Sequence, residues 1–319
     1  MRIGVKLCSE ERSAPELVED AARAEEAGFD FAAISDHFHP WVGAQGESPF
    51  VWGVLGGIAA ATERLEIGTA VTCPTVRMHP AVVAHAAATA ATMLPGRWFL
   101  GVGTGEWLNE HITGSTWPRP DERREMLREA VEVMRLLWAG ELVSHRGDHY
   151  VVEGAQLYSL PDTPIPLLVA AGGSSSASLA GDIGDGMIGT SPDPGLISTF
   201  RERAGDDARA YAEVSVCFDE DADRALKTAL ERWPNAGLPG ALSTELPLPE
   251  HFEQAAGLVT TDGLRSSIVV GPQPEPYLDA ARTYAEAGYD GVWFHQIGVD
   301  QEGFSEFARK ELLPELSSR

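Results

Sequence analysis

The sequence lacks the features that mark membrane, secreted and disulfide-rich proteins. No apolar run approaches the length of a membrane-spanning helix, and the first residues lack the basic region, apolar run and cleavage site of a secretion signal. The only cysteines are Cys8, Cys73 and Cys217, and their wide spacing fits neither a zinc motif nor a disulfide framework. We therefore expect buried free thiols in a cytoplasmic protein with no membrane partner.

Basic residues are scarce. The 319 residues include 48 Asp and Glu against 24 Lys and Arg, which gives a formal net charge of −24 at pH 7, and only three of the basic residues are lysines. A field of this sign opposes binding to nucleic acid and repels anionic ligands. An anionic cofactor would therefore need backbone N–H donors or arginines at its own site.

Short apolar runs alternate with amphipathic stretches along the chain, which is the pattern of βα units. About eight units, with no Gly-x-Gly-x-x-Gly turn after the first strand, predict an α/β fold of the (β/α)₈ TIM-barrel class in one domain, 1–319. The predicted strands are 3–7, 31–34, 66–70, 98–102, 167–171, 186–190, 214–218, 268–270 and 291–295. The predicted helices are 14–27, 50–61, 80–93, 121–139, 174–183, 276–287 and 302–313.

Two segments interrupt this repeat. Residues 142–153 alternate like a hairpin around Gly147 and Asp148, which predicts an insertion after the fourth unit. Residues 233–261 are less regular and rich in Pro and Gly. They predict a loop or lid over the barrel mouth, because long connections in compact domains are usually functional. A disordered excursion is the alternative for this second segment.

The residues just after each strand are the candidates for an active site, because parallel barrel strands end on one face. Polar and glycine-rich stretches follow several of the predicted strands. They are Ser35-Asp36-His37-Phe38-His39-Pro40-Trp41, Val71-Thr72-Cys73-Pro74-Thr75, Gly103-Thr104-Gly105-Glu106-Trp107-Leu108-Asn109-Glu110 and Ala170-Ala171-Gly172-Gly173-Ser174.

Parts of these stretches resemble the luciferase-like barrel superfamily, and more narrowly its branch that uses the deazaflavin coenzyme F420, typified by F420-dependent glucose-6-phosphate dehydrogenase. The matching motifs are Asp36-His37-Phe38-x-Pro40-Trp41, Gly68-Thr69-Ala70-Val71, Pro80-Ala81-Val82-Val83-Ala84 and Gly101-Val102-Gly103-Thr104-Gly105-Glu106-x-Leu108-Asn109-Glu110. The resemblance runs from Ile3 to Gly189 and resumes more weakly from Gly271 to Pro314. It implies an F420-dependent oxidoreductase that acts on a small molecule and forms a homodimer.

Three residues are predicted to carry the hydride chemistry that the resemblance implies. Glu106 is suited to protonate the negative charge that develops at N1 of a deazaflavin, and a carboxylate that only stabilises a helix N-terminus is the alternative. Alcohol oxidation also needs a base, and His37 is the candidate because its reference pKa is about 6.5. The resemblance implies a catalytic role for Trp41, although the bare sequence fits a core residue equally well.

Backbone groups, as well as side chains, are predicted to bind the cofactor. Gly172 and Gly173, directly before a helix, offer free N–H groups and a positive dipole end to a phosphate, with a simple tight turn as the alternative. The resemblance implies a non-proline cis peptide between Ala70 and Val71 against the deazaflavin. The predicted cofactor-binding residues are Asp36, Ala70, Val71, Thr104, Gly105, Asn109, Ala171, Gly172, Gly173 and Thr190.

The substrate side departs from the glucose-6-phosphate branch, where two lysines and an arginine hold the sugar phosphate. The corresponding positions here are 191–195, Gln254 and Gln301-Glu302, and none of them is basic. We therefore predict a neutral substrate other than glucose 6-phosphate. Its predicted pocket is formed by Cys8, Glu10, Trp41, Phe218, His295 and the lid, and a solvated loop acid is the alternative for Glu10.

Three other interpretations stay open. FMN in place of F420 would make the chain a luciferase-like monooxygenase. The spacing of His37 and His39 suits a metal hydrolase, but no later His-Asp set completes such a site, so we predict no metal. A non-catalytic F420 carrier is the third. Within the favoured interpretation, the direction is open between alcohol or hemiacetal oxidation and reduction of C=O, C=C or C=N bonds.

Overall fold

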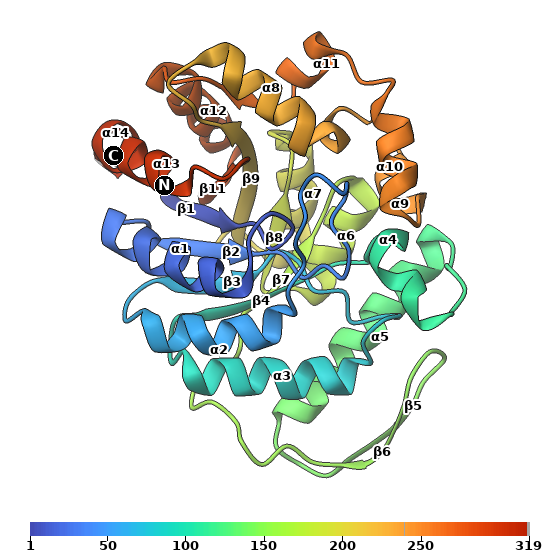
Figure 1. Ribbon diagram of the computed structural model, residues 1–319. Coiled ribbons are helices and arrows are strands. Elements are labelled where there is room, and N and C mark those ends of the chain that lie inside the picture. Colours follow the sequence, from blue (N-terminus) through green and yellow to red (C-terminus); the bar gives the residue numbers. More distant parts are fainter. Residues whose placement is uncertain (239, 318–319) are drawn as a thin grey trace.

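Eight parallel strands close into a barrel. The computed structural model describes residues 1–238 and 240–317. Pairing runs in the order β9, β11, β1, β2, β3, β4, β7, β8, and β8 pairs with β9 to close the ring (Figure 1). These strands are β1 (Arg2–Leu7), β2 (Phe31–Ile34), β3 (Glu66–Thr69), β4 (Trp98–Val102), β7 (Leu167–Ala170), β8 (Gly186–Gly189), β9 (Arg209–Cys217) and β11 (Gly291–Gln296). The predicted TIM-barrel class is confirmed.

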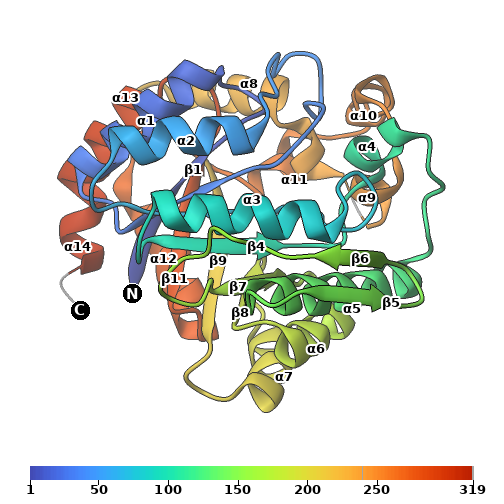
Figure 2. The ribbon, with the colours of Figure 1, turned by 90° about the horizontal axis from the view of Figure 1, so that it is seen from below.

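Helices surround the ring of strands (Figure 2). None in the described ranges is long and apolar enough to cross a membrane. The longer ones are α1 (Ala14–Ala27), α2 (Val51–Ala61), α3 (Pro80–Met93), α5 (Pro120–Trp138), α6 (Ser174–Ile183), α7 (Pro194–Ala204), α8 (Ala222–Arg232) and α12 (Pro274–Ala287). The shorter ones include α4 (Trp107–Glu110), the 3₁₀ turn η1 (His111–Thr113), α13 (Gln301–Phe307), the π-helical turn η3 (Ala308–Leu312) and α14 (Leu313–Ser317).

Helix α1 illustrates how the sequence sets these boundaries. The Ser13 backbone N–H donates to the Glu16 carboxylate at 2.9 Å, which satisfies one of the free donors at the helix start. Leu17, Ala21 and Ala24 recur at helical spacing and are buried against the barrel. The helix ends at Gly28, whose φ of +97° is a left-handed conformation that favours glycine.

Large side chains fill the barrel interior below the strand ends. Phe31 stacks on Tyr211 with ring centroids 4.9 Å apart, and Phe99 and Trp293 approach Phe31 edge-on. Gly68 leaves room for this layer, because a Cβ there would lie 2.0 Å from the Phe99 ring. The aromatic layer fills the barrel interior, and the polar residues that follow the strands lie at the face where the strands end.

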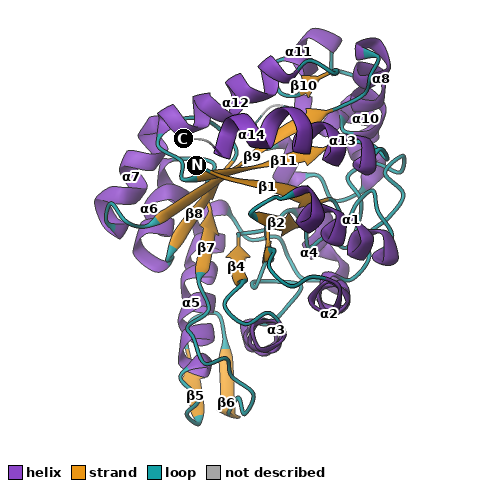
Figure 3. Cartoon of the chain, turned by 90° about the vertical axis from the view of Figure 1, so that its left-hand side faces the viewer, coloured by secondary structure: helices purple, strands orange, loops and turns teal. Residues whose placement is uncertain are grey.

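The insertion predicted at 142–153 is an antiparallel hairpin of β5 (Val143–Arg146) and β6 (Val151–Ala155). It projects away from the barrel beyond α5 (Figure 3). The Glu129 carboxylate on α5 accepts hydrogen bonds from the backbone N–H groups of His149 and Tyr150 at 2.9 and 2.8 Å. These bonds fix the base of the hairpin on the helix.

The segment 233–261, predicted as an irregular loop or lid, contains short helices instead. They are η2 (Pro234–Gly237), α9 (Leu242–Glu245) and α10 (Pro249–Ala256), followed by α11 (Thr261–Arg265). Proline in the first turn of η2 and α10 favours the start of a helix. The prediction considered only that the segment is rich in Pro and Gly, and it missed this effect. Strand β10 (Val269–Val270), predicted as a unit of the ring, only extends the edge of β9 beyond β8.

Candidate active site at the carboxyl ends of the barrel strands

A cavity of about 640 Å³ opens where the barrel strands end. It brings together residues from β1, β2, β3, β4, β7, β8, β9 and the short helices after α8. The predicted site residues that line it are Glu10, His37, Trp41, Ala70, Val71, Glu106, Ala171, Gly172 and Thr190. The cis peptide implied between Ala70 and Val71 is present in this wall.

His37 has a defined hydrogen-bonding arrangement in the cavity. Its Nδ1 lies 3.2 Å from the backbone carbonyl of His39 and 3.5 Å from Glu10 Oε1. A proton on Nδ1 satisfies both acceptors, which leaves Nε2 as the nitrogen that can accept a proton from a ligand. The Trp41 ring lies beside the imidazole, with centroids 5.1 Å apart and planes at 53°.

Glu10 is the acid partner of this histidine, a role that the sequence did not reveal. It is 1% exposed, and its Oε2 accepts a hydrogen bond from the Ser35 hydroxyl at 2.5 Å. Burial opposes ionisation, but the charges of His37 and Lys6 and the Ser35 hydrogen bond outweigh it and lower the pKa of Glu10 to about 2. The expected alternative of a solvated loop acid is therefore wrong.

A second buried ion pair lies across the cavity. Lys6 Nζ is 2.8 Å from Glu213 Oε2, and burial alone would lower the lysine pKa, but Glu213 and Glu10 raise it. Trp293 Nε1 also donates to Glu213 Oε2 at 3.0 Å. We did not predict this ion pair, because β1 and β9 are far apart in the sequence and meet at one cavity only when the barrel has formed. The inward alternation of Tyr211, Glu213 and Ser215 along β9 was the available signal.

Asp36 does not contact His37; instead it holds the loop below the cavity. Arg77 Nη2 donates to Asp36 Oδ1 at 2.9 Å, and its backbone N–H donates to Glu110 Oε2 at 2.6 Å. Burial raises the pKa of Glu110 to about 7, against the Arg77 contacts that lower it. Asn109 Oδ1 accepts from the N–H groups of Phe38 and His39. These bonds fix the loop that carries His37.

Glu106 lies at the N-terminal end of α4, half-buried, with its carboxylate in the cavity wall. Gly105 before it has a φ of +77°, and a Cβ there would lie 2.6 Å from Cys73 Sγ. In the described ranges no cation forms an ion pair with the Glu106 carboxylate, so it stays available to a ligand. Thr104 and Gly105 support this turn without lining the cavity.

The glycine turn before α6 is open to ligand. A Cβ at Gly172 or Gly173 would meet nothing within 4 Å, so the backbone there is uncovered. The N-terminal cap of α6 is Gly173, whose N–H donates to the Ser176 hydroxyl at 3.1 Å. Gly172 lines the cavity and Gly173 lies beside it.

Three residues predicted for the substrate pocket do not line the cavity. Phe218 points outward and stacks on Phe307, with centroids 4.6 Å apart. Cys8 and His295 are buried behind the wall, at 2% and 0% exposure. The side-chain alternation near the strand ends places these residues away from the ligand space.

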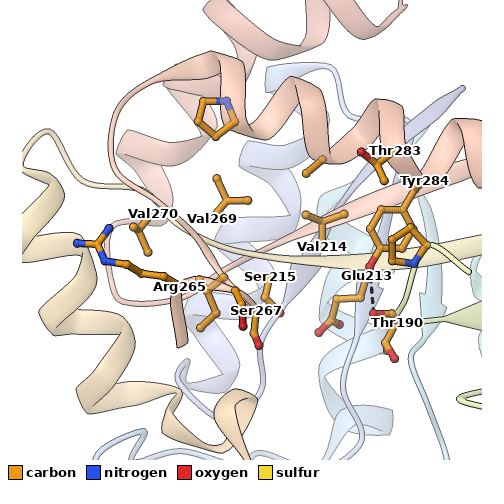
Figure 4. A pocket seen from close by; sticks show the side chains of 15 residues that line it. Thr190, Glu213, Val214, Ser215, Arg265, Ser267, Val269, Val270, Thr283 and Tyr284 are labelled. Atoms are coloured by element: carbon orange, nitrogen blue, oxygen red, sulfur yellow. Dashed lines mark hydrogen bonds between the residues drawn. The ribbon is translucent and has the colours of Figure 1, made fainter. Parts of the chain in front are cut away.

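A smaller space of about 450 Å³ adjoins the cavity between β9, β10 and α12. Figure 4 shows Glu213, Ser215 and Ser267 around it, with the Arg265 side chain at one side. The sequence comparison had placed no basic residue on this side and missed Arg265. Gln301, expected near a substrate, instead donates to the carbonyls of Gln296 and Gly298.

His37 and His39 do not converge on a common metal position. His39 Nδ1 lies 2.9 Å from the Leu108 carbonyl, and its ring stacks on His111. His37 faces Glu10 and the cavity instead. The local spacing of the two imidazoles therefore does not produce the metal-hydrolase arrangement.

Comparisons with known proteins agree over nearly the whole chain. Residues 1–291 match the luciferase-like monooxygenase family. The chain is 37% identical over 331 residues to the F420-dependent glucose-6-phosphate dehydrogenase of Beutenbergia cavernae, covering 100% of this chain and 98% of the relative. It is also 37% identical to the enzyme of the same name from Mycobacterium avium, covering 99% and 98%.

Solved structures give the same result. An F420-dependent secondary alcohol dehydrogenase, in complex with an F420–acetone adduct, superimposes with a TM-score of 0.90 at 30% identity, covering 98% of both chains. The F420-dependent tetrahydromethanopterin reductase from Methanopyrus kandleri has a TM-score of 0.80 at 22% identity, covering 98% of this chain and 99% of the other. At 22% identity the second match shows only a similar fold.

Proposed function

The chain belongs to the luciferase-like monooxygenase family, and from that membership we propose a hydride transfer between coenzyme F420 and a neutral, hydroxyl-bearing small molecule. The chain is an F420-dependent oxidoreductase, since the two relatives at 37% identity and the solved structure at 30% identity, each covering 98% or more of the chain, are F420-dependent dehydrogenases. The FMN alternative is not favoured. The specific substrate class below is our proposal.

The open groups of the cavity fit a deazaflavin with an anionic tail. Asn109 does not line the cavity, but its Nδ2 is a buried donor without a hydrogen-bond partner in the described ranges, and we propose it for a ring carbonyl of the cofactor. Gly172 offers an uncovered backbone N–H to a phosphate, and Gly173, whose own N–H is bonded to Ser176, leaves room for the phosphate to approach the start of α6. When bound, F420 supplies a C5 position that accepts or donates hydride. Ala70 and Val71 would support the ring, and Asp36, Thr104, Gly105, Ala171 and Thr190 complete the proposed binding set.

Four side chains carry the proposed proton transfers and positioning. His37 accepts the substrate hydroxyl proton at Nε2, because its Nδ1 proton is held by His39 O and by the Glu10 carboxylate. The Glu10 charge stabilises the imidazolium that forms. Glu106, elsewhere in the cavity wall, is the group that exchanges a proton with the cofactor. Trp41 closes the substrate side, fixed by an edge-on contact with Phe252 of α10 at 5.2 Å.

The single observation that carries the substrate class is the balance of charge in the wall. Ionised carboxylates of Glu10 and Glu213 line the cavity, whereas the lysine present, Lys6, is paired with Glu213. A doubly charged phosphate would face these acids with only the rim arginine, Arg265, to offset them. A neutral molecule carries no such penalty.

A polar group on the lid side suits a substrate hydroxyl. Asn235 Oδ1 lines the cavity and is buried without a hydrogen-bond partner in the described ranges. An unpaired buried acceptor favours a ligand that donates a hydrogen bond to it. Hydroxyls of Ser215, Ser243, Ser266 and Ser267 extend the same polar surface. We propose that this surface binds the part of the substrate remote from the reacting carbon.

The test begins with an anaerobic titration of the protein with F420 and, separately, FMN, followed by tryptophan emission. Binding of F420 alone should be followed by F420 reduction with neutral secondary alcohols or hemiacetals, and by no response to glucose 6-phosphate. A Glu132→Gln variant on the exposed face of α5 is a matched control and should behave as wild type. Turnover of glucose 6-phosphate in preference to neutral alcohols would overturn the proposed substrate class.

We also propose a homodimer that uses the outer surface of α2 and α3. Phe50, Val82 and Met93 are large apolar side chains there that are 60%, 59% and 46% exposed. Covering such residues is a common reason for self-association. Light scattering should give a dimer mass for wild type and a monomer mass for Val82→Glu. The cytoplasmic location expected from the sequence stays a prediction.

A further inference from the structure

We propose that Cys8, Glu11 and His295 form a buried binding site for a divalent transition-metal ion of the Zn²⁺ class. One ligand atom from each residue lies within 4.8 Å of the other two. Thiolate, imidazole and carboxylate bind zinc at about 2.0–2.3 Å, so ligand atoms of one ion lie roughly 3–4 Å apart. Small side-chain rotations would bring the three groups to that spacing.

The backbone holds these residues close together. Cys8 directly follows β1, and His295 is the penultimate residue of β11, the strand paired with β1. Glu11 lies in the turn after β1, and its Oε2 accepts a hydrogen bond from the Gly298 N–H at 3.0 Å. The site would therefore connect the ends of two strands that are remote in sequence. Its ligands are too far apart along the chain to form a local zinc motif.

The groups in this cluster have unused bonding capacity. Glu11 Oε1 and His295 Nε2 are buried without a hydrogen-bond partner in the described part of the chain, whereas His295 Nδ1 lies beside Glu213. Buried polar groups nearly always have partners, so two such atoms in one cluster point to a ligand. Arg232 approaches Glu11 Oε1 only to 3.8 Å. A cation between these side chains would supply the missing contact.

Charge and donor chemistry select the type of ion. The Cys8 thiol donates a hydrogen bond to Glu10 Oε2 at 3.3 Å, and it would bind the ion as a thiolate after losing that proton. With Glu11 as a carboxylate and His295 as a neutral imidazole, the three ligands and a divalent ion together carry no net charge. Binding releases the Cys8 proton to solvent. A set that contains sulfur and nitrogen favours Zn²⁺ over Mg²⁺ or Ca²⁺, which prefer oxygen donors.

A carboxylate is already placed to orient the histidine. Glu213 Oε1 lies 3.3 Å from His295 Nδ1, which leaves Nε2 for the ion. This is the carboxylate–histidine–metal arrangement in which the outer group fixes the imidazole. The edge-on Trp233 ring, with its centroid 4.3 Å from that of His295, limits solvent access. Because Glu213 lines the catalytic cavity, the ion would stiffen the wall from behind.

The first experiment uses untagged, full-length wild-type protein stripped of metal and titrated with Co²⁺, without F420 or substrate. We expect a near-ultraviolet thiolate-to-cobalt absorption that saturates at about one ion per chain and is displaced by Zn²⁺. Zn²⁺ should also raise the melting temperature of the stripped protein. A folded wild type that shows neither the absorption nor a melting shift would overturn the proposal.

Variants separate this site from adventitious binding. Cys8→Ala should abolish the cobalt–thiolate absorption, and Glu11→Gln should weaken Co²⁺ binding at least about tenfold. Cys217→Ala is the matched control, because Cys217 is a buried free thiol in the same apolar cluster but outside the ligand set. Retention of the absorption in Cys8→Ala, or its loss in Cys217→Ala, would contradict the assignment. If Cys8→Ala does not fold, the Co²⁺ titration of the wild type alone tests the proposal, and absence of the thiolate-to-cobalt absorption would overturn it.

Discussion

The two sides of the cavity differ in how their polar groups are used. Behind the wall that follows β2 to β4, the chain bonds most of its own groups to one another, as in the Arg77 contacts with Asp36 and Glu110, and Asn109 Nδ2 is an exception. On the side formed by β9, β10 and the short helices of 234–265, Asn235 Oδ1 and the Arg265 guanidinium lack such partners in the described ranges. Internal bonding suits a fixed geometry for the cofactor, whereas open groups suit recognition of the substrate.

The largest expected effect is on the cofactor side. Glu106→Gln keeps the shape of the side chain but removes its proton, so turnover should fall by about 10²–10⁴-fold while F420 binding persists. Stopped-flow reduction of F420 and a fluorescence titration measure the two quantities. Glu132→Gln serves again as control. Unchanged turnover would remove the proton-transfer role of Glu106, and lost binding would make it a cofactor-binding residue.

The internal bonding of Glu10 should appear as a pH-dependent stability. Its pKa falls from 4.5 to about 2 in the folded protein, so its contribution is fully present above the ordinary pKa and is lost as pH falls toward 2. At about 1.4 kcal/mol per pKa unit, Glu10→Gln should lower the free energy of unfolding by roughly 3 kcal/mol near neutral pH.

Urea denaturation of both proteins over a pH series tests this expectation. The difference between wild type and Glu10→Gln should shrink as the solution is acidified below the ordinary carboxyl pKa. A difference that stays constant with pH would show that the variant acts through packing and that Glu10 is not held ionised by His37 and Lys6.

On the substrate side, a new cation should extend the range of ligands. Ser267 lines both the cavity and the adjoining space, so Ser267→Lys places an ammonium beside Arg265. One charge-assisted contact is worth about 1.5–3 kcal/mol, which predicts at least a tenfold rise in kcat/KM for a phosphorylated analogue of the accepted substrate. Ser198→Lys on exposed α7 makes the same charge change elsewhere, and an equal rise there would contradict the local explanation.

The smallest effect is expected at Phe218, which the sequence had placed in the substrate pocket. Phe218→Leu removes the ring contact with Phe307, worth about 0.5–1.5 kcal/mol, so the melting temperature should fall slightly. The value of kcat/KM should stay within about twofold of wild type, since the ring points away from the cavity. A large loss of kcat/KM with unchanged stability would restore Phe218 to the pocket.

Features encoded by local pattern could be predicted from the sequence. The alternation of strands and helices predicted the barrel, and the alternation around Gly147 predicted the hairpin. The polar stretches after the strands predicted that His37, Trp41 and Glu106 would meet in one cavity, as they do. These features depend on near neighbours in the chain or on the general rule that parallel barrel strands end together.

Contacts between remote segments could not be predicted in the same way. Lys6 and Glu213 are 207 positions apart, and nothing local signals that they form an ion pair. Whether Cys8 faces the cavity or the protein behind it depends on how the chain turns after β1. A side chain at a strand end can point either way, so position alone did not separate cavity residues from buried ones.

The pairing of β1 with both β2 and β11 has a consequence for synthesis of the protein. Among the barrel strands the ribosome makes β1 first and β11 last, so one edge of β1 stays unpaired until residues 291–296 emerge. An unpaired strand edge is a template for association with other chains. Chains halted before β11 should therefore depend on chaperones that shield exposed strands, whereas completed chains can close the ring themselves.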